Sequence, residues 1–207
     1  MTIHEHVIND VSPTVRILFL RWRDFMYRNV KFNMPDSPIH SMEHCERVLL
    51  YGLLIGEQIW EDDEIRLTQI AQAAVFHDSR RLDEYLDTGH GARASVYYKQ
   101  FCENNNDITY YPEVVYMMRY HDLDDSLGIE AVKKEFGEKA EAMLLQYQIF
   151  KDADALDRWR LGRGGLDEKY LRTSAAKKLV SYSRQIISET MSAELLTQIE
   201  NKVHSSD

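Results

Sequence analysis

Apolar side chains recur at helical spacing along most of this chain, and this pattern restricts the fold more than any other feature of the sequence. In residues 14–30 the spacing is i, i+3, i+4, as on one helix face, with Val15, Leu18, Phe19, Trp22, Phe25 and Met26. The same period predicts helices at about 40–60, 65–78, 92–103, 111–121, 129–136, 138–160, 167–190 and 192–203. No alternating run of useful length is present, so we predict an all-α fold without internal repeats.

Length and composition favour one compact domain. A chain of 207 residues can bury a substantial core, and it is short for two domains. Hydrophobic residues make up 44% and charged residues 29%, as in ordinary soluble globular proteins. We therefore predict a single helical bundle over residues 1–207. The C-terminal apolar stripe consists of Ile187, Met191, Leu195 and Ile199, and we assign it to the core in preference to a dimer contact. A monomer or a homodimer is expected.

The charge and the cysteines exclude several classes of protein. The formal net charge of −9 argues against a general nucleic-acid binder, because cationic side chains supply most of the affinity for phosphate backbones. Residues 1–13 have no apolar segment of a secretory signal, and residues 48–56 are far shorter than the ~20 residues of a membrane helix. We expect no membrane partner and a cytoplasmic location. Cys45 and Cys102 form no C-x-x-C pair and are expected as buried thiols.

Three histidines stand where predicted helices begin or end. The apolar run 73–76 leads directly into His77 and Asp78. His90 follows a polar loop and precedes a helix, whereas His121 stands at the end of the next helix. An imidazole and a carboxylate at such positions are typical metal ligands, so these residues are candidate members of one metal site.

Further candidate ligands lie on two other predicted helices. His40 and His44 are one turn apart, so their Cβ atoms are expected about 5–6 Å apart on the same helix face. Cys45 points roughly 100° away from His44 around the axis and is a poor co-ligand. Asp152 and Asp154, on the later helix, compete for one ligand position.

The order of these residues resembles the HD superfamily, the all-α metal-dependent phosphohydrolases named for their His-Asp pair. The matching segments are 44–48 (HCERV), 76–78 (FHD) and 153–157 (ADALD). The resemblance spans about 39–163, which implies a metal-site core there, with the helices 14–30 and 167–203 packed on it. It also favours Asp154 over Asp152, at about three to one, because Asp154 occupies the A-D-x-L-D position.

Two further histidines make the chain resemble those members of the superfamily that bind two metal ions. The segments 89–92 (GHGA) and 119–121 (RYH) look like the extra histidines of such members. The resemblance implies that one ion is held by His44, His77, Asp78 and Asp154. It implies that a second ion is held by His90 and His121, with Asp78 bridging the two.

The resemblance also implies catalytic roles for Asp78 and His40. The pair His40-x-x-x-His44 is similar to the H-N-x-x-H motif of cyclic-nucleotide phosphodiesterases, in which the first histidine protonates the leaving oxygen. Ser41 stands where that motif has Asn. No Gly-Tyr-Pro follows His121, so cyclic di-GMP is not expected as a substrate.

The ligand chemistry indicates which cofactors and reactions to expect. A shell of imidazoles and carboxylates suits Mn, Fe, Co, Ni or Zn, with Mg as an alternative, as one or two ions. Metal-activated water attacking a phosphoester or phosphoanhydride of a nucleotide or another small phosphorylated metabolite is the expected reaction. Two alternatives stay open: an HD-type diiron oxygenase, and a non-catalytic metal-bound ligand-sensing domain.

Basic residues gather in one segment of this acidic chain. Residues 151–178 contain eight Lys or Arg and five Asp or Glu, a local charge of +3 that leaves −12 for the remainder. This asymmetry indicates an anionic ligand, and the Gly162 to Gly165 loop is close in sequence. A solvated helix face is the alternative for any single arginine. The candidates for binding phosphate oxygens are Arg81, Arg158, Arg160, Arg163 and Arg172.

Overall fold

The all-α prediction is confirmed. The structure, a computed structural model, describes residues 2–61 and 63–204, with the side chains of 202–204 left out, and no strand occurs among them. Residues 1, 62 and 205–207 of the predicted domain lie outside this range. The α-helices are α1 (Glu5–Asn9), α2 (Pro13–Asn29), α3 (Met42–Trp60), α4 (Glu64–Phe76), α5 (His90–Asn104), α6 (Pro112–Tyr120), α7 (Asp125–Phe136), α8 (Ala140–Leu156), α9 (Ser174–Lys178), α10 (Val180–Thr190) and α11 (Ala193–His204). Short 3₁₀ turns are η1 (Gly137–Lys139), η2 (Asp157–Leu161) and η3 (Glu168–Tyr170).

Side-chain caps fix several helix starts. Ser12 accepts a hydrogen bond from the backbone N–H of Val15 at the start of α2, and Pro13 takes the first helical position. Asp63 caps α4 through the N–H of Arg66 in the same way. These caps satisfy backbone donors that have no partner inside a helix, so local sequence decides where α2 and α4 begin.

The helices α3 and α4 form an antiparallel hairpin at the centre of the bundle. Residues on every side of α3 are buried, as expected for a helix enclosed by others. Gly52 of α3 permits close contact, since a Cβ there would lie 2.6 Å from the Ile70 Cγ2 atom of α4. The hairpin places the start of α3 beside the end of α4, so His44 and His77 meet.

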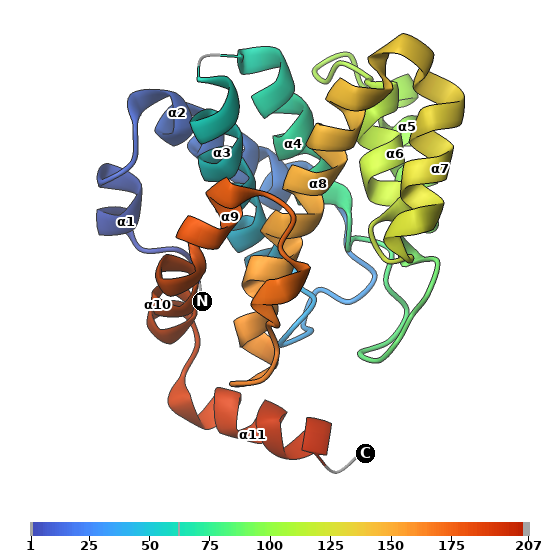
Figure 1. The fold of residues 1–207 in the computed structure, drawn as a ribbon. Helices are drawn as coiled ribbons and strands as arrows, with labels where there is room; N and C mark the ends of the chain where they lie inside the picture. The colour runs from blue at the N-terminus through green and yellow to red at the C-terminus, as the bar shows by residue number, and fades with distance from the viewer. Residues whose placement is uncertain (1, 62, 205–207) are drawn as a thin grey trace.

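The helices α5 and α6 form a second antiparallel pair, and α8 crosses the bundle between this pair and the α3–α4 hairpin (Figure 1). Gly91 lies where α5 and α6 touch. A Cβ at Gly91 would be 2.2 Å from the backbone oxygen of Met118, so only glycine allows this approach. The contact brings His90 of α5 next to His121, the residue that follows α6.

Several predicted boundaries are wrong, and one predicted helix is broken. Residues 167–190 form η3, α9 and α10 in place of one helix. Asp167 caps η3 and Thr173 caps α9 with their side chains, so local capping competes with continuation of the helix. The helix predicted from residue 40 begins at Met42, which leaves His40 in the turn before it. The helix predicted at 129–136 begins earlier, at Asp125, behind its cap Asp124.

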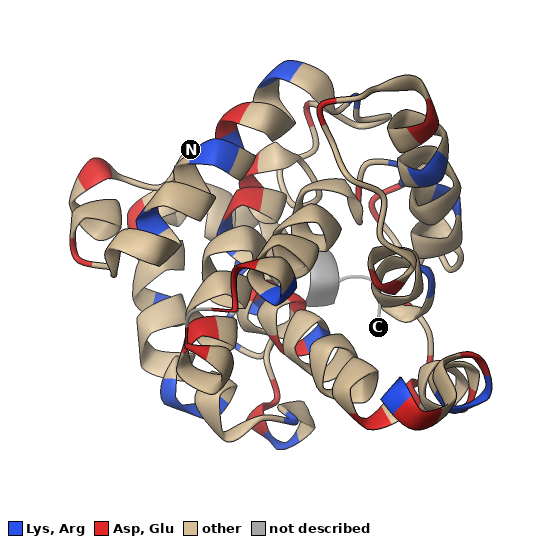
Figure 2. Cartoon of the chain, turned by 90° about the horizontal axis from the view of Figure 1, so that it is seen from above, with Lys and Arg blue, Asp and Glu red and all other residues tan. Residues whose placement is uncertain are grey.

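One large core and one small cluster fill the interior of the described residues. The assignment of the C-terminal stripe to the core is confirmed for Ile187, Met191 and Ile199, which are buried together, with Leu195 packed against them. Cys45 is fully buried, as predicted, whereas Cys102 is half-buried. Among the described helices, none combines the length and apolarity needed to cross a membrane. Basic and acidic residues are interspersed over the molecule when it is viewed from above (Figure 2).

Candidate metal centre

Two histidines and an aspartate from three helices form one half of a buried cluster. His44 lies in the first turn of α3, and His77 directly follows α4. Their Nε2 atoms are 3.1 Å apart. The Oδ1 atom of Asp154, from the last turn of α8, lies 3.3 Å from His44 Nε2 and 4.0 Å from His77 Nε2. This spacing allows all three side chains to bind one ion.

The second half of the cluster is built in the same way. The Nε2 atoms of His90 and His121 are 2.9 Å apart. The Oδ1 atom of Asp78 lies 3.0 Å from His90 Nε2 and 3.7 Å from His121 Nε2. Ligand atoms of His77, Asp78 and His121 are also close enough to bind one ion.

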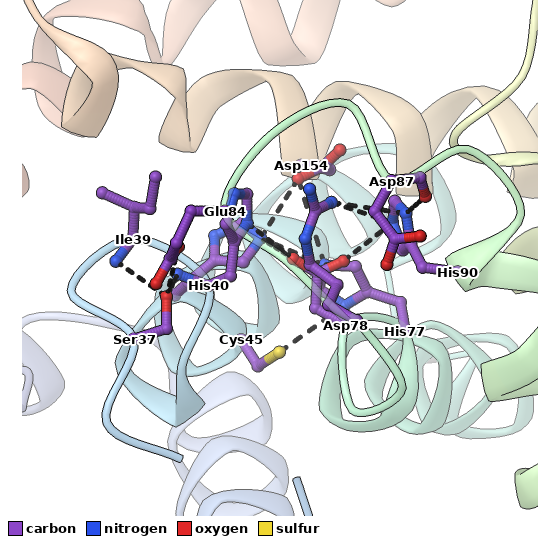
Figure 3. A network of polar contacts seen from close by, with 12 residues as sticks. Ser37, Ile39, His40, Cys45, His77, Asp78, Glu84, Asp87, His90 and Asp154 are labelled. Carbon is purple, nitrogen blue, oxygen red and sulfur yellow. Dashed lines mark hydrogen bonds and ion pairs between the residues drawn. The ribbon is translucent and has the colours of Figure 1, made fainter. Parts of the chain in front are cut away.

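Asp78 connects the two halves. Its Oδ2 atom lies 3.5 Å from His44 Nε2 and 3.1 Å from His40 Nδ1, while its Oδ1 atom faces His90. In Figure 3 the carboxylate lies between His40 and His90, with Asp154 above it. Every histidine and aspartate that the sequence predicts as a metal ligand is therefore present in one cluster.

The backbone fixes the direction of three imidazoles. The Nδ1 atom of each lies within hydrogen-bond distance of the carbonyl oxygen three residues earlier: His77 to Ala74 at 2.8 Å, His90 to Asp87 at 2.7 Å and His121 to Met118 at 2.7 Å. A carbonyl oxygen only accepts hydrogen bonds, so each Nδ1 carries a proton, and in the neutral ring Nε2 is the nitrogen with the lone pair. His77 and His121 follow helices, where such carbonyl oxygens lack a partner inside the helix.

Asp157 orients His44, the fourth imidazole, and sequence reasoning did not identify it. It is fully buried, and its Oδ2 atom accepts from His44 Nδ1 at 2.7 Å. The same carboxylate accepts from Nε and Nη2 of Arg47 at 2.7 and 3.0 Å. Asp157 is the last residue of the A-D-x-L-D segment, but the sequence has no signal for the buried Arg47 as its partner.

The facing nitrogens explain why this cluster fits a cation. Two Nε2 lone pairs at 3.1 Å, and two more at 2.9 Å, repel each other unless a metal ion or a proton lies between them. Asp78 and Asp154 supply negative charge beside both pairs. Metal-binding histidines typically donate their other N–H to a carbonyl or a carboxylate, as these four do. The donor set therefore fits divalent transition metals.

The ionisation of the cluster follows from its burial and its charges. Burial, with the neighbouring His44 and His121, lowers the pKa of His77 to about 3, so this imidazole stays neutral at neutral pH. Burial also lowers the pKa of His40 to about 4. For Asp78, burial acts to raise the pKa, but the surrounding imidazoles outweigh it and hold the pKa well below its ordinary value. Neutral imidazoles and an ionised carboxylate are the forms that bind metals.

The structure separates Asp154 from Asp152. Asp152 points away from the cluster and accepts hydrogen bonds from the backbone N–H groups of Arg172 and Thr173 and from the Thr173 hydroxyl. Arg172 is in turn held by Asp125 through two hydrogen bonds of 2.7 and 2.8 Å. Asp154 is thus the aspartate in the cluster, as predicted. The guanidinium of Arg172 is bound by Asp125 and Asp152.

His40 reaches the cluster by a different route from the predicted one. It stands in the turn before α3, and its backbone N–H donates to Ser37 Oγ at 2.8 Å. Its ring centre lies 6.2 Å from that of His44, and its Nδ1 atom faces Asp78. A loop, not a shared helix face, therefore brings His40 to the site.

Of the five arginines predicted to bind phosphate, two lie at the cluster, and three, including Arg172, do not. Arg81 Nη1 is 3.3 Å from His90 Nδ1, and Arg160 Nη1 is 3.7 Å from Asp157 Oδ2. Arg158 is exposed and donates to the backbone oxygen of Gly165. Arg163 is exposed as well, and neither it nor Arg158 contacts the cluster within the described ranges.

The cluster is nearly closed to solvent. Asp154 is its most accessible member, with 28% of its side chain exposed, whereas the side chains of Asp78, His44 and His77 are at most 3% exposed. Asp154 is therefore the ligand most accessible to solvent. Compared with protein-family models, curated proteins and solved structures, the chain matches none of them.

Proposed function

We propose that this chain is a metal-dependent hydrolase of the HD superfamily, acting on a phosphoester or phosphoanhydride of a nucleotide or another small phosphorylated metabolite. One observation carries the proposal. Four imidazoles from four helix ends have their Nδ1 atoms bound to protein acceptors, so their Nε2 lone pairs converge on Asp78 and Asp154. The resemblance of the segments 44–48, 76–78 and 153–157 to the HD pattern supports the same proposal.

In this proposal each half of the cluster holds one ion. His44, His77, Asp78 and Asp154 are proposed to hold the first, and His90 and His121 the second together with Asp78. The distances between their ligand atoms support both sets. When bound, Mn, Fe, Co, Ni, Zn or Mg ions activate a water molecule and offset the charge that develops on phosphoryl oxygens.

His40 is proposed to transfer a proton to the leaving oxygen. With a pKa of about 4 it is neutral at neutral pH and donates from Nδ1 to Asp78 Oδ2. A phosphate group bound beside the ring raises the pKa of His40, because the negative charge favours the imidazolium form. Asp78 then accepts the hydrogen bond from Nδ1–H, while Nε2–H donates its proton to the leaving oxygen.

The first test is metal-dependent turnover. Protein loaded with Mn, Co or Ni is expected to hydrolyse members of a panel of p-nitrophenyl phosphates and nucleotides. Asp78→Ala is expected to abolish this activity, because it removes the carboxylate shared by both halves of the cluster. Asp107→Ala, at an exposed loop position, is the matched control and should keep full activity.

The same preparation distinguishes the alternatives. Metal-replete protein that is inert on the whole panel contradicts the proposal. Oxygen uptake after anaerobic loading with iron would identify an oxygenase. A lower melting temperature after chelation, without turnover of any substrate, would identify a metal-bound sensing domain.

The proposal includes a cytoplasmic location and a monomer or homodimer. Free thiols such as Cys45 and Cys102 persist in a reducing compartment. Fractionation of cells that express the chain, followed by detection of the protein and of its thiols, tests the location.

A further inference from the structure

We infer that the site takes phosphomonoesters, whose terminal phosphate is a dianion, in preference to phosphodiesters, and that Arg160 binds this phosphate. The inference rests on the proposed function and specifies its substrate class. It depends on three features of the site: an arginine nitrogen without a hydrogen-bond partner, the charge of the groups in and around the cluster, and the low solvent exposure of every ligand except Asp154.

Arg160 has a buried nitrogen with no hydrogen-bond partner. The residue lies in η2 and is 4% exposed. Its Nε atom donates to the backbone oxygen of Ile39 at 2.7 Å, which fixes the guanidinium in place. Its Nη1 atom is buried without an acceptor, since the nearest carboxylate oxygen, Asp157 Oδ2, is 3.7 Å away. An unpaired buried donor is costly, so a ligand oxygen is the expected acceptor.

The contacts of Arg160 place it at the reacting side of the cluster. Ile39, which holds Nε, precedes His40, and Asp157, which lies nearest to Nη1, holds His44. Asp157 is already bound by Arg47 through two hydrogen bonds, so it does not need Arg160 as a partner. The free nitrogen is therefore available to a substrate that reaches His40 and His44.

Arg81 supplies positive charge on the other side of Asp78. It is buried, and its Nη1 atom lies 3.3 Å from His90 Nδ1. Figure 3 shows His40 and His90 on opposite sides of Asp78. Guanidinium groups thus flank the cluster at both ends, and guanidinium is the side chain best matched to phosphate oxygens.

The charge of the groups in and around the cluster favours a dianion. With the metal-bound imidazoles neutral, the four carboxylates and three guanidiniums in and around the cluster leave −1, and two divalent ions would change this to +3. These residues are Asp78, Asp122, Asp154, Asp157, Arg47, Arg81 and Arg160. A phosphomonoester at neutral pH carries a charge close to −2 and leaves about +1, whereas a diester monoanion leaves about +2. Uncompensated buried charge is unfavourable, so the monoester is the better fit.

The low solvent exposure of the cluster also favours a terminal phosphate. Asp154 is the accessible ligand, while Ser37 Oγ donates to Glu84 Oε2 at 2.8 Å and joins the loops that carry His40 and Arg81. Both loops are seen beside the site in Figure 3. A monoester can insert its phosphate with one substituent pointing outward. A diester needs room for substituents on both sides of phosphorus.

Binding of two small probes tests the inference without any variant. Methyl phosphate and dimethyl phosphate differ by one methyl group and one charge, and they are titrated into the metal-loaded protein by calorimetry at about pH 8, where the monoester is a dianion. Methyl phosphate is expected to bind about tenfold more tightly or better, the gain of one extra charge-assisted contact. Equal or tighter binding of dimethyl phosphate, or no binding of methyl phosphate, overturns the inference.

Variants of Arg160 test its role as the phosphate ligand. Arg160→Gln is expected to weaken methyl phosphate binding about tenfold at unchanged metal content. Arg160→Lys keeps the charge and serves if the glutamine variant folds poorly, and it is expected to give an intermediate loss. Arg28→Gln, on a side chain 78% exposed, is the control and should bind like the parent chain. Unchanged affinity for methyl phosphate in either folded Arg160 variant would show that Arg160 does not bind the phosphate.

Turnover separates failure of this inference from failure of the proposed function. The metal-loaded protein is compared on p-nitrophenyl phosphate and bis(p-nitrophenyl) phosphate, which release the same product. Faster cleavage of the diester keeps the hydrolase and overturns the monoester preference. Tight binding of methyl phosphate without cleavage of either compound would support the preference for monoesters and contradict the proposed hydrolase activity.

Discussion

The Nε2 atoms of His44 and His77 lie 3.1 Å apart although 33 residues separate them in the chain. Asp157 holds the far side of the His44 ring, and the Ala74 carbonyl oxygen holds that of the His77 ring, so neither can turn its N–H group toward the other. This arrangement is stable with a cation between the two nitrogens and strained without one. The site is therefore expected to depend on that cation and on the packing that surrounds it.

Substitution of the two neighbouring aspartates of α8 should give opposite results. Asp154→Asn is expected to lower metal affinity by more than about tenfold with little loss of stability, because its carboxylate faces the imidazoles. Asp152→Asn should keep the metal and lower the free energy of unfolding by about 3 kcal/mol, because it weakens a buried contact with Arg172 and Thr173. Metal analysis and urea unfolding measure both effects, and the reverse pattern would contradict the ligand assignment.

Gly91→Ala should damage the half of the site that contains His90. The new Cβ would lie 2.2 Å from the Met118 oxygen and 2.7 Å from His121 Nδ1, so α5 and α6 must separate. We expect a loss of about 1–3 kcal/mol of stability and a lower content of the second metal. Gly164→Ala is the control, because a Cβ there meets nothing within 4 Å. Equal metal content in the two variants would show that the close approach is dispensable.

Asp157→Asn should weaken metal binding without removing a ligand. The change weakens the hydrogen bond that orients His44 and leaves Arg47 without its charge partner. Loss of a group that orients a metal-binding histidine typically lowers metal affinity 10–100-fold. The Arg47 and His44 side chains outweigh burial and lower the pKa of Asp157, so its contribution to stability is present above pH 3.8 and is lost as the pH falls further. Acid unfolding of the metal-free variant should therefore be less steep than that of the parent chain.

Metal-free protein should lose stability between pH 6.5 and about 4. Burial lowers the pKa of His77 to about 3 and that of His40 to about 4, so the unfolded chain takes up protons over this range and the native state does not. Each group contributes on the order of 1 kcal/mol per pH unit. His121 does not offset this loss: Asp78 outweighs burial and raises its pKa, so its contribution is fully present below pH 6.5 and is lost only as the pH rises above that value. Urea unfolding with a chelator present measures the slope, and stability that rises on acidification would contradict these protonation states.

Local sequence determined the helices and the chemical nature of the site. Apolar periodicity and caps such as Ser12 and Asp63 depend on contacts within a few residues, so most helices were predictable. A histidine just after a helix can bond to the carbonyl oxygen three residues earlier, as His77 and His121 do, and this contact is also local. The prediction was wrong where local signals compete, as at 167–190, where Asp167 and Thr173 each start a new short helix.

The sequence by itself therefore determined which residues are candidate metal ligands, and backbone contacts three residues away orient the rings of His77, His90 and His121. Only the tertiary structure decided that His44 and His77 meet, that Asp154 and not Asp152 joins them, and that Arg160 keeps a free nitrogen beside them. The physical reason is the distance along the chain over which each kind of interaction acts. Backbone hydrogen bonds and capping act over three or four residues, whereas the distance between two helix ends depends on packing of side chains from the whole core, including the space left at Gly52 and Gly91.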